Sequence, residues 1–275
     1  QQISPILVTL FLLLSGISTN TLLSSCSASD EASGPAYHIV LASDQAAYSD
    51  LNQIQQRIYD TFVRCLLLKD HQDLDKLSDE LEALAQKQPQ NLVRYWQSYL
   101  QYYSAIYYGA NGQKDKSETT INQAIERLES LKGKNAEDYA LLSLAQSYSI
   151  QFQSSFKAAM LSSRVKSNGE KALAIDPANL RAYYVLASND YYTPEKYGGG
   201  TKAESYLLKA LEQPDQAVEN PYLPSWGRAE AYEMLIKFYI KKQEWEKAKT
   251  QYQAATQHFP DHYQINKLAS QLVGH

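Results

Sequence analysis

The stretch AYEMLIKFYIKKQEWEKAKTQYQAATQHFP, residues 231–260, decides the fold. Its first part places Tyr232, Leu235 and Tyr239 at helical spacing, and a polar break follows at residues 241–244. The second part carries small and aromatic residues at the same spacing and then a proline, namely Ala248, Tyr252, Ala255 and Pro260. Small residues let two antiparallel helices approach closely, and aromatic rings fill the gaps that remain. The stretch therefore predicts a helical hairpin.

These positions resemble the tetratricopeptide repeat (TPR), whose pattern sets an aromatic residue, a Leu and a Tyr on the first helix. The family then sets Ala, an aromatic residue and Ala on the second helix, with a Pro at the end of the unit. Ile236 departs from this pattern, because the family usually has a small residue after the Leu. The resemblance implies an all-α fold, a right-handed solenoid built from helical hairpins.

Earlier segments repeat the second-helix pattern in weaker form. One alanine anchors this pattern in each of these segments and in the C-terminal repeat, and the four are Ala124, Ala172, Ala210 and Ala255. Consecutive anchors lie 38 to 48 residues apart. A strict tetratricopeptide repeat is about 34 residues long. The repeats are therefore elongated, and HEAT-like helix pairs remain an alternative.

The repeats form one continuous domain over residues 45–275, with about five helix pairs and a C-terminal cap. We expect the pairs at residues 46–87, 90–131, 136–176, 178–213 and 226–258. An amphipathic capping helix is expected from Asp261 to Val273, with Leu268 and Leu272 on its inner face. The composition agrees, since the 275 residues include only 11 Gly and 9 Pro, too few for the frequent turns of a β-sandwich.

Residues 1–26 have the pattern of an export signal. The run from Ile3 to Ile17 is apolar and uncharged, and it is shorter than the roughly 20 residues that span a bilayer. The sequence Leu23-Ser-Ser-Cys26 follows, and it resembles the lipobox of bacterial lipoproteins, in which the cysteine is acylated and becomes the mature N-terminus. The resemblance implies lipidation of Cys26. A plain secretory signal cut near residues 25–28 is the alternative.

Residues 27–44 follow as a tether whose first part is too polar to bury. Together with the leader, the tether implies an exported protein that is periplasmic or is held at the outer membrane by its lipid alone. The other cysteine, Cys65, lies in an apolar helical pattern, and we expect a buried thiol there. A disulfide between Cys26 and Cys65 is open only if Cys26 carries no lipid.

Residues 191–204 hold three consecutive glycines, Gly198–Gly200. No β-strand is expected before them and no Gly-Lys-Ser/Thr motif ends them, which disfavours a phosphate-binding loop. We expect Pro194 to end one helix, and Thr201 with Glu204 to form a capping box for the next. The wider region, which includes residues 171–177, 181–184, 192–194 and 224–227, resembles exported bacterial TPR-type proteins of unassigned function. Its Gly-Gly-x-x-x-Ala element also resembles the T-component lipoproteins of tripartite periplasmic transporters.

Charge and motifs argue against nucleic acid binding and catalysis. The net charge of −4 gives no field that would attract polyanions. The five histidines are scattered, and Pro260 interrupts the helical register that His258 and His262 would need to share a metal. No HExxH motif, nucleophile elbow or convincing Cys/His arrangement occurs. We therefore expect a noncatalytic protein without a metal or cofactor.

Tyrosine is the most unusual feature of the composition, with 22 residues. The densest cluster lies between residues 95 and 108, on two neighbouring faces of one expected helix. One face suffices for packing, so the second lines the concave groove of the solenoid or adds bulk to its core. The residues expected to line the groove or bind a ligand there are Arg94, Ser98, Tyr99, Gln101, Tyr102, Tyr184, Asn189, Tyr191, Tyr197, Glu233 and Lys237.

Two functions are consistent with such a groove. The first is a noncatalytic scaffold of the bacterial cell envelope that binds a protein or peptide partner. TPR domains that clamp a C-terminal carboxylate share a Lys/Asn/Arg set that this sequence lacks, so chaperone-type tails are disfavoured. The alternative is a periplasmic transporter accessory protein that captures a small amphipathic solute, which the tyrosine excess and the Gly-Gly element favour.

Lipidation of Cys26 is tested by metabolic labelling with a fatty-acid analogue. We expect Cys26→Ala to lose the label, because only the lipobox cysteine is acylated, and we expect Cys65→Ala to keep it. Equal labelling of Cys26→Ala and the wild type would show that the leader is an ordinary secretory signal.

Overall fold

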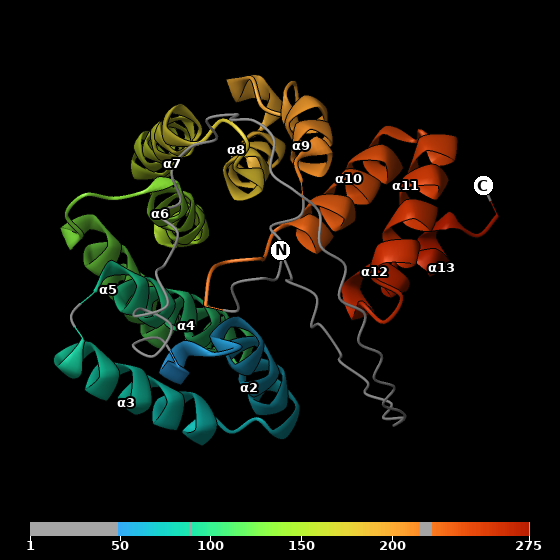
Figure 1. Ribbon diagram of the computed structural model, residues 1–275. Coiled ribbons are helices and arrows are strands. Elements are labelled where there is room, and N and C mark those ends of the chain that lie inside the picture. The colour runs from blue at the N-terminus through green and yellow to red at the C-terminus, as the bar shows by residue number, and fades with distance from the viewer. Residues whose placement is uncertain (1–48, 89, 215–221, 275) are drawn as a thin grey trace, which may run out of the picture.

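The computed structural model describes residues 49–88, 90–214 and 222–274 (Figure 1), so the leader with Cys26 and the whole tether lie outside the described residues. The described residues form helices and connecting turns, with no strand. In chain order the helices are η1 (Ser49–Leu51), α2 (Ile54–Leu68), α3 (Gln72–Lys87), α4 (Asn91–Ala110), α5 (Lys114–Ser130), α6 (Ala136–Ser149), η2 (Ile150–Phe152), α7 (Ser155–Ile175), α8 (Leu180–Tyr192), η3 (Glu195–Tyr197), α9 (Ala203–Glu212), α10 (Arg228–Lys242), α11 (Trp245–His258), α12 (Tyr263–Lys267) and α13 (Ala269–Leu272).

Consecutive helices pack as hairpins, and the hairpins follow one another in an arc. The most extensive packing joins α4 to α5, α6 to α7, α8 to α9 and α10 to α11. The first helix of each pair lies on the inner side of the arc and the second on the outer side (Figure 1). The predicted all-α, TPR-like solenoid with five helix pairs is therefore confirmed, and the predicted pair boundaries agree with the helices. None of the helices in the described part of the chain combines the length and apolar character that a membrane span requires.

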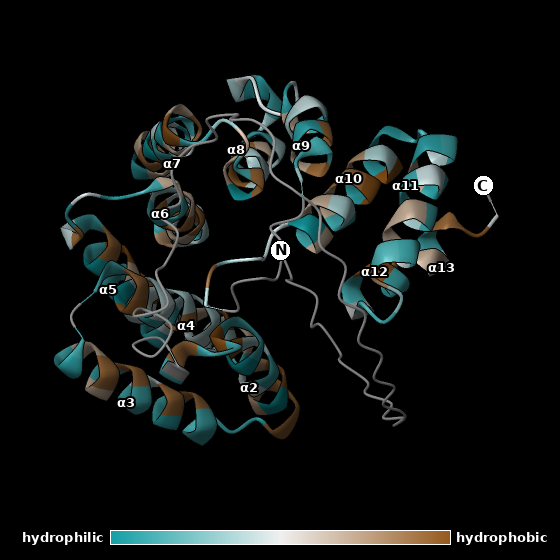
Figure 2. Ribbon diagram, viewed as in Figure 1, coloured by the Kyte–Doolittle hydropathy of each residue, from teal (hydrophilic) through white to brown (hydrophobic). Residues whose placement is uncertain are grey.

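The core follows the small and apolar positions of the repeat pattern. Apolar residues gather on the helix faces that meet neighbouring helices (Figure 2). The four anchoring alanines are completely buried, and they are Ala124, Ala172, Ala210 and Ala255. The thiol of Cys65 is also buried, as predicted, and burial raises its pKa. Close approach of the paired helices thus depends on side chains no larger than a methyl group at these points.

The C-terminal cap differs from the predicted single helix. It is divided into α12 and α13, and Leu268 lies between them. Leu268 and Leu272 are buried against the last pair, as predicted. The helix begins after His262, whose Nδ1 accepts a hydrogen bond from the backbone N–H of Ile265, so the expectation that Asp261 opens it was wrong.

The glycine loop is a bend between α8 and α9, as predicted. A Cβ atom on Gly199 would lie 1.9 Å from the carbonyl oxygen of Thr193, so only glycine fits there. The predicted capping box of Thr201 and Glu204 was wrong. Instead, the carboxylate of Asp190 accepts hydrogen bonds of 2.8 Å from the backbone N–H groups of Lys202 and Ala203. The loop is therefore held to the end of α8, and the backbone N–H groups of all three glycines are used in hydrogen bonds within the loop or to α8.

A segment at residues 222–227 leads into α10 by way of the inner side of the arc, close to α4 (Figure 1). The indole N–H of Trp226 donates a hydrogen bond of 2.8 Å to the hydroxyl of Tyr95. The indole N–H of Trp96 donates one of 2.8 Å to the carbonyl of Tyr222. The backbone N–H of Ser225 donates to the side chain of Gln55 on α2. These hydrogen bonds therefore connect the segment before the fifth helix pair to the first and second pairs.

A buried ion pair joins α6 to α8 beneath that segment. The guanidinium of Arg181 donates two hydrogen bonds to the carboxylate of Glu137, and both side chains are almost fully buried. Arg181 also donates to the carbonyl oxygen of Trp226 at 3.1 Å, and the amide of Asn179 donates to Glu137 at 2.7 Å. A buried pair of this kind is held in one geometry because any other would leave a charge without a partner.

Removal of one partner should be strongly destabilising. We expect Arg181→Met to lower the free energy of unfolding by about 3–5 kcal/mol, because the buried carboxylate of Glu137 loses its counter-charge. The exposed pair of Arg57 and Glu80 supplies a matched control, and Arg57→Met should cost at most about 1 kcal/mol. Denaturant unfolding measures both. Equal losses in the two variants would mean that the buried pair contributes no more to stability than an exposed one.

Candidate functional site

The strongest candidate site is a group of tyrosines on the inner helices, here called the inner tyrosine cluster. Its members come from α2, α4, α6 and α8, and they are Tyr59, Tyr102, Tyr103, Tyr148 and Tyr184. Tyr59 is 38% exposed and the other four are half-buried. Each of these side chains is therefore partly accessible to solvent.

Ring contacts join Tyr59, Tyr102, Tyr103 and Tyr148 directly, and Tyr184 is linked to them through Trp226 and Tyr99. The ring centre of Tyr103 lies 4.8 Å from that of Phe62 and 6.0 Å from that of Tyr59. Further along α4, the ring of Tyr102 meets that of Tyr148 edge to face at 5.8 Å. These distances are typical of stable aromatic pairs, so the rings support one another in fixed orientations.

The first turn of α10 faces the cluster across the arc. Glu230 raises the pKa of Tyr59 on α2 and also that of Tyr184 on α8, although burial is the larger cause for both. Glu233 acts on the same two tyrosines. Glu230 and Glu233 therefore lie within electrostatic range of tyrosines from two different repeats. The start of α10 and the helices that carry the cluster lie on the same, inner side of the arc (Figure 1).

The tyrosines of the cluster remain neutral at physiological pH. Burial raises the pKa of Tyr102, Tyr103 and Tyr184 above the usual value of a phenol, and Glu230 raises them further. The carboxylate of Glu230 is itself held by the backbone N–H of Gly227 at 2.9 Å, and burial raises its pKa. The inner face thus offers apolar rings and neutral hydroxyl groups rather than phenolates.

This arrangement suits binding rather than catalysis. Neutral rings provide flat apolar area, and hydroxyl groups donate or accept single hydrogen bonds. Within residues 49–88, 90–214 and 222–274, no three His, Cys, Asp or Glu side chains are placed to hold a metal ion. His262 caps α12, and the ring of His258 stacks on Tyr232, so each has a structural contact.

Of the eleven predicted groove residues, Tyr102 and Tyr184 belong to the inner tyrosine cluster. Tyr99 lies beneath it, with 3% of its surface exposed and its ring stacked on Trp226 at 6.0 Å. Ser98 is completely buried, and its hydroxyl donates to the carbonyl of Arg94. Tyr99 can therefore position the cluster from below, while Ser98 has no surface to offer a ligand.

Three other predicted residues lie on other faces. Gln101 accepts a hydrogen bond from Arg127 of α5 at 3.5 Å, and Arg94 lies close enough to lower the pKa of Arg127, which burial lowers more. Asn189 accepts from Ser162 of α7 at 2.9 Å. The side chains of Gln101 and Asn189 thus bond to the second helices α5 and α7, and a groove role for Arg94 stays a prediction.

The remaining predicted residues lie around the edge of the cluster or beyond it. Glu233 and Lys237 form an ion pair along α10. Tyr191 packs on Phe238, and the ammonium group of Lys241 lies 5.4 Å from the centre of the Tyr191 ring. Tyr197 is 70% exposed on η3. A ligand role for these residues remains a prediction.

Sequence reasoning missed Tyr59, Tyr148 and Glu230. Tyr59 follows the buried Ile58 on α2 and Tyr148 lies near the end of α6, so each looked like an ordinary packing residue. Glu230 looked like a first-turn capping residue, which it also is. Their convergence depends on the curvature of the whole arc, and no local pattern in the sequence reports that curvature.

The raised pKa values predict how the protein responds to alkali. Because the phenols have a higher pKa in the folded chain, an unfolded chain loses these protons first. The free energy of unfolding should therefore fall as the pH rises above about 10. Tyrosinate absorbance and circular dichroism, followed together, should show part of the tyrosines ionising only as the helices melt. Full ionisation of all tyrosines in a still-folded protein would contradict this.

Comparison with known proteins supports the fold but gives no family. No protein-family profile matches the chain, and no curated protein matches it in sequence. Among solved structures, a TPR protein from Thermus thermophilus is 17% identical, with a TM-score of 0.52 over 80% of this chain and 99% of that one. The HusA haemophore from Porphyromonas gingivalis is 21% identical, with a TM-score of 0.50 over 74% of this chain and 96% of that one. The chain is therefore similar in fold to TPR proteins of bacteria.

Proposed function

We propose that this protein is a noncatalytic binding protein that holds a flat, amphipathic aromatic molecule on the inner tyrosine cluster. The observation that carries the proposal is the convergence of neutral tyrosines from four inner helices in front of α10. A peptide main chain needs many hydrogen-bond partners, whereas a flat apolar ring system needs stacking area. The cluster supplies more aromatic stacking area than hydrogen-bond partners.

The energetics are adequate for such a ligand. Each well-oriented aromatic contact contributes about 0.5–1.5 kcal/mol beyond area burial. Three or four contacts, together with the apolar area that they cover, suffice for binding in the micromolar range. Since the rings are already fixed by one another, little side-chain freedom is lost when a ligand stacks on them.

A porphyrin such as haem is the ligand class that fits best. It combines a flat aromatic surface with carboxylate groups on one edge. Lys237 and Lys241 lie on α10 next to Tyr191, at the edge of the cluster, where such carboxylates would meet positive charge. The similarity in fold to the HusA haemophore motivates this choice, and the residues named here give it a physical basis.

The proposed setting is the bacterial cell envelope. The leader pattern of residues 1–26 favours export, and the sequence that ends at Cys26 favours a lipid anchor. An exported binding protein meets its ligand before the ligand reaches the inner membrane, as the alternative function of a periplasmic transporter accessory protein requires.

A protein or peptide partner is the second candidate. It is favoured by the TPR-like arc, because stacked helical hairpins commonly present an extended inner surface to partners. The exposed rings of Tyr192 and Tyr197 beside α9 would extend such a surface beyond the cluster. A partner of this kind would contact several repeats at once.

The first candidate is tested by titrating the purified protein with haemin and with metal-free protoporphyrin, followed by absorbance. We expect Tyr184→Ala and Tyr102→Ala to weaken binding about ten-fold each, since each removes one stacking surface. Tyr102→Phe should retain most of the affinity because it keeps the ring. Tyr206→Ala, on the outer helix α9, is the matched control and should bind like the wild type.

Two results separate the candidates. Loss of porphyrin binding in the cluster variants, with unchanged melting temperatures, supports the small-molecule site. Absence of binding to either porphyrin, or equal weakening in Tyr206→Ala, would overturn it. A partner recovered from envelopes by the wild type but not by Tyr192→Ala would then favour the scaffold.

A further inference from the structure

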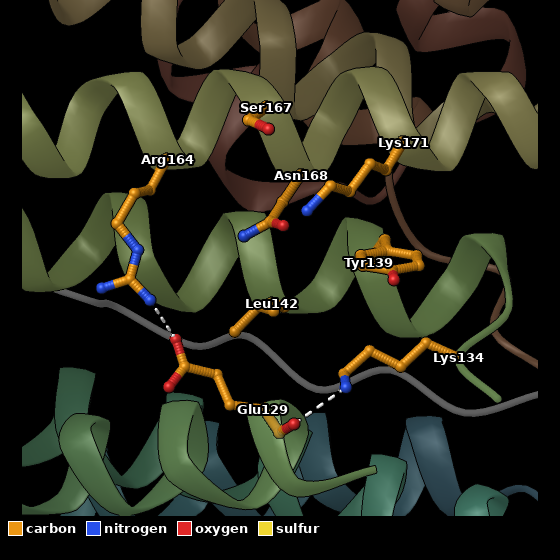
Figure 3. A pocket seen from close by; sticks show the side chains of 8 residues that line it. All are labelled: Glu129, Lys134, Tyr139, Leu142, Arg164, Ser167, Asn168 and Lys171. Carbon is orange, nitrogen blue, oxygen red and sulfur yellow. Dashed lines mark hydrogen bonds and ion pairs between the residues drawn. The ribbon is translucent and has the colours of Figure 1, made fainter. Parts of the chain in front are cut away.

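We infer that a second site, on the other side of α6, binds a small phosphate ester that also carries hydroxyl groups. A cavity of about 320 Å³ lies there between α5, α6 and α7 (Figure 3). This volume is at the lower end of the range for small-molecule sites. Its wall is formed mainly by polar and charged side chains, so an apolar ligand would not fit it.

The floor of the cavity is a fixed polar chain. The amide of Asn168 donates to Gln146 at 2.8 Å, and the amide of Gln146 donates to Oε1 of Glu129 at 3.1 Å. Arg164 donates to the same oxygen at 2.6 Å. Gln146 is completely buried and Asn168 almost so. Because these hydrogen bonds hold Glu129 and Arg164 in place, the site is organised before any ligand arrives.

One end of the cavity is cationic. Lys134, Lys171 and Tyr139 lie together at that end, with Ser167 and Lys171 on the same face of α7 (Figure 3). Within the described part of the chain, the ammonium group of Lys171 has no carboxylate partner, and it lies 5.6 Å from the centre of the Tyr139 ring. Lys134 donates to the carbonyls of Glu129 and Leu131, so it adds charge to the site while capping α5.

The other end offers acceptors. Only Oε1 of Glu129 takes part in the hydrogen bonds of the floor, so Oε2 has no hydrogen-bond partner among the described residues. The carbonyl oxygen of the Asn168 amide, which lies between Arg164 and Lys171 in Figure 3, likewise has no hydrogen-bond partner among the described residues. Acceptors of this kind require donors from the ligand, and hydroxyl groups supply them without adding positive charge.

The two ends together define the ligand. Three cations face one carboxylate, so the site favours an anion. The hydroxyls of Ser167 and Tyr139 and the ammonium of Lys171 suit the oxygens of a phosphate group. Glu129 would repel a bare phosphate at the other end but would accept hydrogen bonds from hydroxyls. A sugar phosphate satisfies both ends, whereas inorganic phosphate satisfies only one.

The experiment compares glucose 6-phosphate, inorganic phosphate and glucose by isothermal titration calorimetry on the full chain. We expect glucose 6-phosphate to bind in the millimolar range or tighter and the other two to bind more weakly. Lys171→Ala should weaken the binding of glucose 6-phosphate about five-fold or more. Glu129→Gln should weaken glucose 6-phosphate but not inorganic phosphate, which distinguishes a shaped site from a general attraction of anions.

Lys157, which is exposed near the start of α7 and outside the cavity, supplies the control. Lys157→Ala should bind like the wild type. Equal losses in Lys157→Ala and Lys171→Ala, or no binding of glucose 6-phosphate, would overturn the inference. The site shares no residue with the inner tyrosine cluster, so this result is independent of porphyrin binding.

Discussion

The position of Trp226 is the constraint on which the rest of the structure depends. Its ring stacks on Tyr99 at 6.0 Å and meets Tyr184 edge to face at 6.3 Å. Its indole N–H is satisfied by Tyr95, so burial leaves no polar group without a partner. Solenoid repeats usually contact only their neighbours in sequence. Here one side chain fastens the fifth pair to the second and fourth, which fixes the curvature of the arc and hence the spacing of the inner tyrosines.

The buried pair of Glu137 and Arg181 supports that position at a cost in desolvation. An apolar pair of similar volume would often be as stable or more stable. An apolar side chain, however, could not donate a hydrogen bond to the carbonyl of Trp226, as Arg181 does. Gly227 then follows with a φ of 113°, where a Cβ atom would lie 2.8 Å from Leu180. The ion pair of Glu137 and Arg181, together with Gly227, therefore restricts the backbone to one conformation where it enters α10.

The sequence predicted what depends on local spacing. Helix pairs could be located because Ala124, Ala172, Ala210 and Ala255 must be small wherever two helices cross. The assignment of residues to a groove rests on an analogy with a shorter repeat, and it stays a prediction. On α4, which has 20 residues, the side chain of Gln101 accepts a hydrogen bond from Arg127 of α5. The cap of α9 was also missed, because Asp190 reaches it across the whole glycine loop.

The two candidate sites differ in chemistry because they lie on different sides of the same helices. On the inner side, burial keeps the phenols neutral, so the tyrosines themselves offer no counter-ion to a charged ligand group. On the α5–α6–α7 side, the cations Arg164 and Lys171 remain accessible to water, so an anion can keep part of its hydration while it binds. A repeat helix has two faces beyond its packing stripe, and elongation of the repeat gives each face more residues. The two proposed ligands, one aromatic and one phosphorylated, would therefore not compete for the same residues.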